Sequence, residues 1–374
     1  MRRLFLTFML GVCLSGQGWS QQQRQIIVSN SDTYDRKEIV VIPYENFVQH
    51  FQVDSIFTVR DTKGQVIVHQ LEKLGQQKPQ HVLLQVAVPA GQQQVLHVAP
   101  EAAPAVASKT YARYVPERLD DFAWENDVVA FRLYGKALEG HKDDAQGMDY
   151  WAKRTDRLII DHWYKTNDYH KDHGEGLDYY SVGQTLGAGD MALFLDKEVQ
   201  YTWHYRGHQV LDNGPLRTTF RLDYEPQVIK GQRVAFQKTI SLDAGSNFNK
   251  IQIDLNNKDR QRTPIVVGVA KRKEDNPALT VAADGSTLAY WEPDMDGHGR
   301  TGVALILPFK GAKYHPDRKE QALLATHIDN GTPFIYYNGA AWDRAGKITT
   351  AQQWNDAVEA FKHRVKSPLT VHLK

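Results

Sequence analysis

The stretch Val234-Ala235-Phe236-Gln237-Lys238-Thr239-Ile240 has the β-branched and aromatic residues that are typical of a β-strand. From Tyr111 onward, similar runs recur at 128–134, 220–224, 250–254, 265–269, 302–307 and 334–337. Asn338-Gly339 follows the last of these runs and is predicted to be a turn. A β unit of roughly 250 residues with few helices is a large sandwich or barrel, so we predict two big twisted sheets, one of them concave.

One helix is predicted, and it lies near the C-terminus. Thr350 and Gln353 have the spacing of a capping box, in which each side chain bonds a free backbone N–H of the helix start. The apolar face of this helix consists of Trp354, Val358 and Phe361. Residues 369–373 then return as a closing strand, which we assign to the large unit.

Residues 24–100 are predicted to form a second, smaller β unit. Its predicted strands are 25–28, 38–42, 56–59, 66–68, 81–88 and 94–98. They recur at intervals of roughly 8–15 residues, which matches a sandwich of the immunoglobulin type. Residues 101–110 have the Ala, Pro and Ser content of a linker. We therefore predict an all-β protein with a small sandwich domain at 21–105 and a large domain at 111–374.

Residues 1–20 have the features of a secretory signal peptide. Arg2 and Arg3 precede an apolar run from Leu4 to Leu14, and the small residues that follow predict cleavage after Ser20. The run is too short to span a membrane. We expect a periplasmic or secreted protein without a membrane span.

Cleavage would also remove Cys13, the one cysteine of the chain, so disulfides and thiol chemistry are not expected in the mature protein. Loss of Arg2 and Arg3 leaves 43 of the 45 basic side chains against 44 acidic ones, a net charge near −1. Without a basic surplus, nucleic acid is not an expected partner. The 17 Tyr, 14 Phe and 8 Trp suit either a sheet-rich protein or one that stacks aromatic rings on sugars.

The densest group of side chains that can carry a proton lies in residues 169–180, Tyr169-His170-Lys171-Asp172-His173-Gly174-Glu175-Gly176-Leu177-Asp178-Tyr179-Tyr180. The polar residues do not share one face of a two-residue repeat, so this stretch is not a core strand. We predict a loop over a sheet face. Such a loop is either functional or simply a polar surface loop, and the clustering of these residue types favours function.

Four further motifs accompany this loop, namely Pro116-Glu117-Arg118, residues 121–127, residues 130–135 and Leu242-Asp243-Ala244-Gly245-Ser246-Asn247. Together with residues 169–180 they resemble the domain of unknown function 4861 family over most of the mature chain. The resemblance implies an exported protein with a galactose-mutarotase-like supersandwich core. It also implies chemistry on pectin-like and other uronate glycans, without naming a reaction.

The candidate catalytic residues are His170, His173, Glu175, Asp178 and Tyr179. A histidine with its ordinary pKa of about 6.5 is well placed for acid–base catalysis. A tyrosine can serve in uronate lyases once a neighbouring His or cation activates its phenol. The alternative is a divalent metal held by the two histidines with Glu175. Because the ligand spacing is not clean, we expect neither a cofactor nor a need for added metal.

The candidate substrate-binding residues are Glu125, Asn126, Arg132, Tyr180 and Trp291. If Arg132 faces the groove, its guanidinium can pair with a substrate carboxylate through two hydrogen bonds. Otherwise it is a buried arginine satisfied by Glu125 or Asp127. Trp291 is a candidate stacking platform for a sugar ring. It begins a second polar cluster, residues 291–300, whose Asp294-Met295-Asp296-Gly297 is predicted to be a plain turn.

Three functions remain open. The first is cleavage of a uronic-acid-containing polysaccharide or oligosaccharide, either by a lyase through β-elimination or by a glycoside hydrolase. Elimination needs a proton acceptor and a cation for the carboxylate, which would be drawn from His173, Tyr179 and Arg132. Hydrolysis needs two carboxyl groups, which would be Glu175 with Asp178 or Glu125.

The second function is that of a sugar mutarotase or epimerase, and the third is non-catalytic glycan binding. A binding protein has no need of an acid–base loop, so residues 169–180 count against the third. The chain has no phosphate-binding Gly-rich loop, no nucleophile-elbow serine and no dinucleotide fingerprint. Phosphoryl transfer, serine hydrolysis and nicotinamide redox chemistry are therefore disfavoured.

Overall fold

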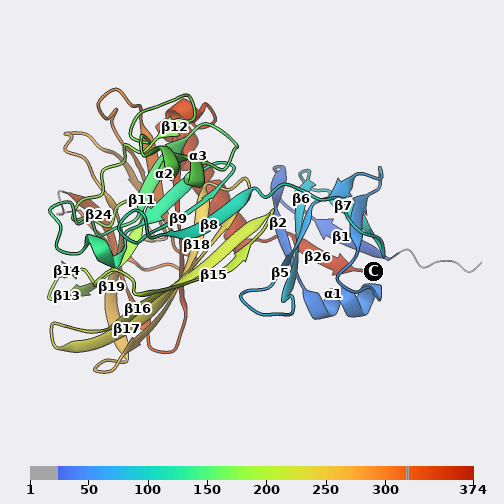
Figure 1. The fold of residues 1–374 in the computed structure, drawn as a ribbon, viewed down its shortest axis with the longest axis horizontal. Helices are drawn as coiled ribbons and strands as arrows, with labels where there is room; N and C mark the ends of the chain where they lie inside the picture. The colour runs from blue at the N-terminus through green and yellow to red at the C-terminus, as the bar shows by residue number, and fades with distance from the viewer. Residues whose placement is uncertain (1–23, 317, 319) are drawn as a thin grey trace, which may run out of the picture.

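The computed structural model describes residues 24–316, 318 and 320–374. The predicted signal peptide and its cleavage site after Ser20 lie outside these residues. Within them the chain is mostly β-strand, and a small unit sits beside a large one (Figure 1). No helix in the described ranges is long and apolar enough to cross a membrane.

The small unit is a sandwich of two antiparallel sheets. The first sheet runs in the order β26 (Thr370–Leu373), β1 (Gln25–Ser29), β7 (Gln93–Ala99), β3 (Thr58–Asp61) and β4 (Val66–Ile67). The second runs β2 (Arg36–Pro43), β6 (His81–Val88) and β5 (His69–Glu72). Their apolar faces enclose a core that includes Phe47 and Phe51 of the short helix α1 (Tyr44–Phe51). Burial of this face holds the two sheets together.

The C-terminal strand belongs to the small unit. β26 pairs antiparallel with β1, and the N–H of Gln25 and the carbonyl oxygen of Lys374 are 2.8 Å apart, as are the reverse pair. Figure 1 shows this red strand among the blue ones. The assignment of residues 369–373 to the large unit is thus corrected. A domain boundary in the linker stays a prediction.

An eight-stranded antiparallel sheet forms the centre of the large unit. Its order is β15 (Gly207–Asn213), β16 (Arg217–Ile229), β17 (Gln232–Asp243), β18 (Phe248–Asn257), β25 (Phe334–Trp342), β22 (Thr301–Ile306), β21 (Thr287–Trp291) and β20 (Ala278–Val281). Alternate residues such as Phe220, Leu222 and Ile240 point into the main core. The residues between them face the other side of the sheet.

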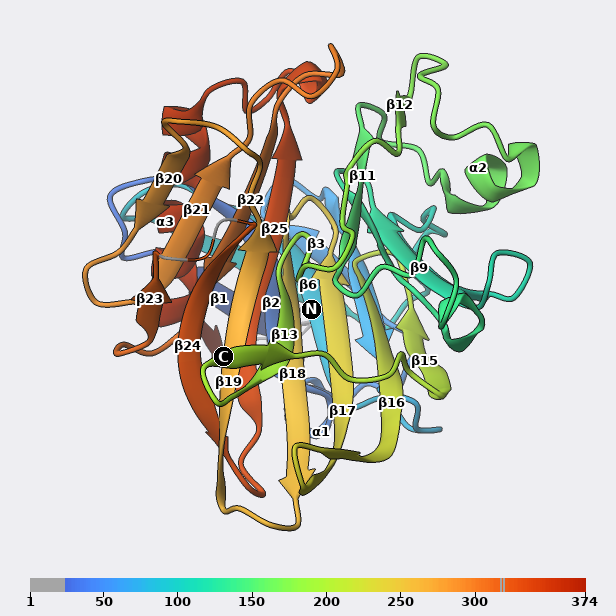
Figure 2. The ribbon, with the colours of Figure 1, turned by 90° about the vertical axis from the view of Figure 1, so that its left-hand side faces the viewer.

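Two five-stranded sheets face the eight-stranded sheet across this core (Figure 2). One runs β12 (Gly176–Leu177), β11 (Asp149–Lys153), β10 (Ala130–Leu133), β9 (Asp121–Asn126) and β8 (Thr110–Val115). The other runs β14 (Glu198–Gln200), β13 (Asp190–Leu195), β19 (Arg262–Ala270), β24 (Gln321–Asp329) and β23 (Lys313–His315). The all-β sandwich architecture predicted from the sequence is confirmed.

The helix predicted near the C-terminus is confirmed as α3 (Ala351–Lys366). The Thr350 hydroxyl accepts a hydrogen bond of 3.2 Å from the Gln353 N–H, and Trp354 is buried against the eight-stranded sheet. α1 and α2 (Ile160–Thr166) were not predicted, and neither were the 3₁₀ turns η1 (Lys136–Leu138) and η2 (Asp343–Ala345). These elements are too short for a helical repeat to show in the sequence.

The Asn338-Gly339 pair is not a turn, because β25 continues through it. A side chain at position 339 would meet the Phe248 ring at 2.3 Å, and the Asn338 amide donates a 2.9 Å hydrogen bond to the Ala188 carbonyl. A glycine is needed here for close packing, and the asparagine satisfies a buried carbonyl group.

Candidate functional site

The loop 169–180 connects α2 to the edge of a five-stranded sheet. Its strand β12 pairs with β11, with Leu177 opposite Ala152. Gly176 has a φ of 119°, and a Cβ there would lie 2.0 Å from the Ala152 carbonyl oxygen. Only glycine fits at that point. The contact fixes where the loop leaves the surface and enters the molecule.

The first half of the loop lies on the surface and makes ion pairs of its own. The His173 Nε2 atom is 2.8 Å from Asp168 Oδ2, and the Glu175 carboxylate is 2.8 Å from the Arg157 guanidinium. His170 Nδ1 lies 2.9 Å from a backbone carbonyl oxygen. The three side chains thus have separate partners. Among the described residues, no group of three or more His, Cys, Asp or Glu is arranged to hold a metal ion.

This half of the loop also lines a pocket of about 320 Å³ against α2, which includes His173, Glu175 and His162. The pocket places two of the predicted catalytic side chains near each other at the surface. Larger hollows of about 510 Å³ lie elsewhere on the molecule. A catalytic role of His170, His173 and Glu175 stays a prediction.

Arg132 is buried and shared by three carboxylates. Its Nη2 atom lies 2.5 Å from Asp149 and 2.9 Å from Asp178, and its Nη1 atom lies 3.5 Å from Asp121. Its partners are therefore not the predicted Glu125 or Asp127. With 4% of its surface exposed, Arg132 has no face to offer a substrate carboxylate.

Three carboxylates around one guanidinium leave an excess of negative charge. Burial raises the pKa of Asp121 to about 6. Burial and the neighbouring Asp149 carboxylate together raise the pKa of Asp178 well above its usual range. Burial and like charge therefore favour the protonated form of Asp178, and Asp178 holds the loop to the sheet by accepting a hydrogen bond from Arg132.

Glu125 and Asn126 are buried and fully engaged by the protein. The Glu125 carboxylate accepts the N–H groups of Ile159 and Ile160 at 2.8 Å, where α2 begins, and pairs with Lys153 at 2.8 Å. Asn126 accepts two backbone N–H groups and donates to two backbone carbonyls. These contacts position the helix and adjoining turns, and leave neither side chain free for substrate.

Trp291 is also buried, with 4% of its surface exposed. It packs beneath α3 beside Trp354, and a Cβ at Gly302 would meet its ring at 2.8 Å. The ring is therefore not available as a stacking platform in this structure.

The second half of the loop meets the polar cluster 291–300 at one end of the sandwich. The Tyr179 hydroxyl lies 2.6 Å from the Thr301 hydroxyl. Its ring centre is 5.5 Å from that of His298 and 6.2 Å from that of Trp342. Tyr179 and His298 are both half-buried. Burial raises the pKa of Tyr179, so its phenol is a proton donor and not a ready base.

Tyr180 lies deeper, beside a buried ion pair. The Arg272 guanidinium stacks 4.8 Å above the Tyr180 ring, and its Nη2 atom lies 3.0 Å from Glu292 Oε1. Burial raises the pKa of Glu292 to about 7. The Tyr180 hydroxyl and the Glu292 Oε2 atom have no hydrogen-bond partner among the residues that the structure describes.

These side chains form what we name the Tyr179 cluster, which consists of Tyr179, Tyr180, Arg272, Glu292 and His298. Of its members, the sequence predicted Tyr179 as catalytic and Tyr180 as substrate-binding. It missed the other three. The signal for two of them was present in the polar run 291–300, but only the fold brings that run to the loop.

Arg154 links the two halves of the loop. Its guanidinium pairs with Asp172 at 2.7 Å and lies 5.4 Å above the Trp342 ring, which in turn lies beside Tyr179. One third of this side chain is exposed, so its guanidinium is a surface cation that contacts the same Trp342 ring as Tyr179 does.

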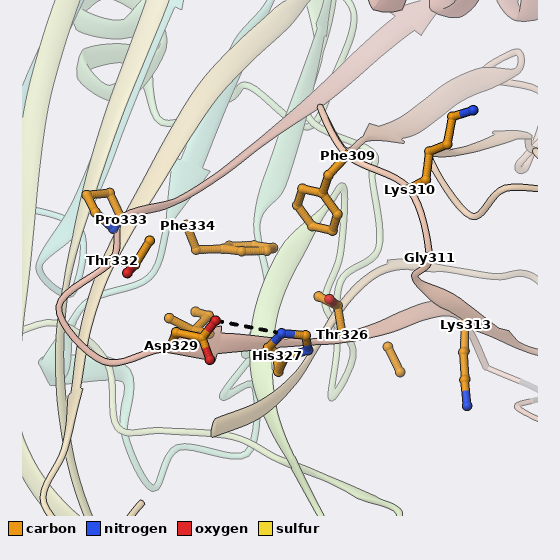
Figure 3. Close-up of a pocket in the computed structure, with 12 residues that line it drawn as sticks. Phe309, Lys310, Gly311, Lys313, Thr326, His327, Asp329, Thr332, Pro333 and Phe334 are labelled. Atoms are coloured by element: carbon orange, nitrogen blue, oxygen red, sulfur yellow. Dashed lines mark ion pairs between the residues drawn. The ribbon is translucent and has the colours of Figure 1, made fainter. Parts of the chain in front are cut away.

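A separate hollow of about 510 Å³ lies at β24 (Figure 3). Phe309 and Phe334 form part of its wall with ring centres 5.7 Å apart, and His327 lies 3.9 Å from Asp329. No residue that the sequence predicts as a site residue lines this hollow.

Comparison with known proteins gives the family. Residues 28–371 match the family described as "Domain of unknown function (DUF4861)". The chain is 31% identical over 283 residues to "Uncharacterized protein P7" of Formosa agariphila, which covers 71% of this chain and 70% of that protein.

Two solved structures share the fold. An alpha-mannosidase from Enterococcus faecalis V583 superposes with a TM-score of 0.52 at 10% identity, over 95% of this chain and 46% of that one. A protein in the Glycosyl Hydrolase Family 38 from Enterococcus faecalis superposes with a TM-score of 0.50, also at 10% identity, over 95% and 48%. The chain thus spans about half the length of each. Since the family match covers nearly the whole sequence, this chain belongs to the DUF4861 family.

Proposed function

We propose that this chain is a carbohydrate-active enzyme that acts on a uronic-acid-containing, pectin-like glycan in the periplasm or outside the cell. The observation that carries the proposal is the Tyr179 cluster, in which a neutral phenol and an imidazole lie side by side at the surface. The fold shared with two proteins titled as an alpha-mannosidase and a glycosyl hydrolase supports action on sugars.

β-Elimination is the reaction that this geometry supports best. It requires a base to remove the proton beside the carboxylate, an acid to protonate the leaving oxygen, and a cation to stabilise the developing charge. The His298 imidazole is the proposed base and the neutral Tyr179 phenol the proposed acid. Arg154 is the proposed cation for the carboxylate, the role predicted from the sequence for Arg132.

Hydrolysis is the second candidate, and the likeness to a glycosyl hydrolase favours it. Hydrolysis uses two carboxyl groups that flank the scissile bond. Of the carboxyl groups that the sequence nominates for this role, Glu125 and Asp178 are buried and bonded to Lys153 and Arg132. Only Glu175 reaches solvent, so the predicted pair is incomplete.

The test is an incubation with a panel of oligouronides and neutral oligosaccharides. A product that absorbs as a conjugated unsaturated uronate supports elimination, and new reducing ends without that absorbance support hydrolysis. A change of sugar configuration alone would favour an epimerase or mutarotase. Binding without any product would refute catalysis and favour the glycan-binding alternative.

Single substitutions then test which side chains act as the general acid and base. Tyr179→Phe and His298→Ala should each lower kcat by roughly 10²-fold, the usual scale for a lost general acid or base. Tyr314→Phe removes the hydroxyl of a partly buried tyrosine outside the cluster and should leave kcat unchanged. His173→Ala and Glu175→Ala test the competing surface pocket. Loss of turnover in those two variants, with Tyr179→Phe fully active, would move the site there.

A further inference from the structure

The face of the eight-stranded sheet that points away from the core carries many polar side chains. Alternate residues of β16, β17 and β18 point away from the core and carry hydroxyl, amide and charged groups. One row across four strands consists of Thr219, Ser241, Lys250 and Tyr337. The next two rows consist of Arg221, Thr239 and Gln252, and of Asp223, Gln237 and Asp254.

Two hollows lie along these rows. The first, of about 510 Å³, contains the Lys250 row and is also lined by Leu74 and His81 of the small unit. The second, of about 400 Å³, contains the Asp223 row. The two rows are four residues apart along β16, which is about 13 Å. The hollows therefore follow one another along the strands and suit an extended ligand.

The first hollow contains two cations, Arg217 and Lys250, and only Arg217 is paired with carboxylates. Arg217 is paired with Asp243 at 2.9 Å and with Glu72 at 3.4 Å, and Glu72 is also 2.7 Å from His81. Lys250 makes no ion pair or hydrogen bond with the residues that the structure describes. It projects beside the paired hydroxyls of Thr219 and Ser241, which are 3.0 Å apart. An unpaired ammonium group next to hydroxyls is suited to a carboxylate on a sugar.

The second hollow contains carboxylates, Asp223 and Asp254, in place of an unpaired cation. Asp223 is paired with Arg221 at 3.0 Å, and Asp254 accepts the Gln252 amide at 2.9 Å. These carboxylates can still accept hydrogen bonds from sugar hydroxyls, but they would repel a second carboxylate. The face thus favours one acidic sugar at Lys250 and neutral sugars beyond it.

We infer that this sheet face binds an oligosaccharide in which one uronate is followed by neutral sugars. The uronate carboxylate pairs with Lys250, and the Tyr337 ring lies next in the row where it can stack on a sugar face. The neutral part extends along β16 and β17 toward Asp223. This inference rests on the proposed function, since it names the glycan that the enzyme would hold, and it places the holding surface away from the Tyr179 cluster.

Calorimetric titration tests the inference. The probes are a tetrasaccharide of one galacturonate and three neutral sugars, the same compound with its carboxyl group reduced to an alcohol, and a tetrasaccharide of galacturonate alone. The compound with one galacturonate should bind tightest to the unaltered protein. Lys250→Met should weaken that binding at least tenfold, and should not change the binding of the reduced compound. Lys250→Arg should retain most of the affinity.

Lys258→Met is the matched control, because Lys258 is exposed on the loop after β18 and lines neither hollow. It should bind like the unaltered protein. Equal affinity of Lys250→Met and the unaltered protein, or of the acidic and reduced compounds, would overturn the inference while leaving turnover untouched. Conversely, a fully active Tyr179→Phe variant would refute the proposed catalytic site and leave this binding intact.

Discussion

Glu292 shows how one buried residue ties stability to pH. Its carboxyl group is fully buried beside Arg272, and burial raises its pKa from 4.5 to about 7. Between those values the folded protein holds a proton that the unfolded chain releases. The stabilisation is therefore fully present below pH 4.5 and is lost as the pH rises through 7.

We predict that Glu292→Gln removes this loss. The free energy of unfolding of the unaltered protein, relative to that of the variant, should fall by roughly 3 kcal/mol as the pH rises from 4 to 8. Denaturant unfolding at several pH values measures the difference. Glu198→Gln, at an exposed side chain, is the control and should show no such change. Parallel curves for Glu292→Gln and the unaltered protein would contradict the assignment.

For single residues, the sequence predicted which side of a strand a side chain lies on, but it did not predict which other segments cover that side chain. The alternation around Arg132 correctly sets it apart from Phe131 and Leu133, which lie in the main core. It does not reveal that α2 and the loop cover the other face as well, because that depends on segments 30 to 50 residues further along the chain. The same limit applies to Trp291, whose ring is covered by α3.

Among the elements, α2 is a helix of only seven residues that depends on an outside carboxylate. Short helices are marginal by themselves. Glu125 supplies acceptors for the first N–H groups of α2, and it neutralises the buried Lys153. α2 in turn presents Trp163 and Tyr164 to Trp151, so this carboxylate organises the sheet edge from which the loop departs.

We predict that Glu125→Ala lowers the free energy of unfolding by about 3–5 kcal/mol, because it leaves Lys153 buried without a counter-charge. Glu125→Gln should cost less, since its amide oxygen still accepts from α2. Glu117→Ala, at an exposed ion pair, is the control and should change stability by less than about 1 kcal/mol. Thermal and chemical unfolding measure these effects. If Glu125→Gln were fully stable yet inactive, Glu125 would instead contact substrate, as the sequence suggested.

Helices and strands could be predicted where a short stretch of sequence carries a clear pattern. In the eight-stranded sheet, the β-branched runs predicted β16, β17, β18, β22 and β25 but not β15, β20 or β21. α3 was predicted from its cap and apolar face. The helices α1 and α2 were missed because each has only about two turns. The turn predicted at Asn338-Gly339 was wrong, because close packing of Gly339 against Phe248 overrides the usual turn preference of an Asn-Gly pair.

For the whole molecule, we predict that the segment joining the two units is the one most open to cleavage. Residues 101–109 contain no strand or helix, and the Val106 side chain is 53% exposed. We predict that thermolysin cuts there first under native conditions. Denaturing gels should then show two fragments, whereas size-exclusion chromatography should show one peak, because β26 still binds the fragments together through β1. Separation of the fragments without denaturant would contradict this pairing.

The overall architecture followed from composition and strand spacing, but the assembly of the site did not. Tyr179 and His298 are 119 positions apart in the sequence, and nothing in either local pattern indicates that they meet. Their contact is set by the packing of the sheet that carries β12 against the sheet that carries β22. In a sandwich, residues that are distant in sequence come into contact at the ends, where loops from both layers converge.

The pairing of β1 with β26 has a consequence for how the protein is made. β1 is synthesised before the large unit, and its partner strand β26 is synthesised after it. Until then β1 is the outermost strand of its sheet, and exposed strand edges invite pairing with other chains. The unit synthesised first is therefore the last to be completed. In the completed sheet β26 replaces β1 as the outermost strand, and this exchange takes place only after the large unit and α3 have been synthesised.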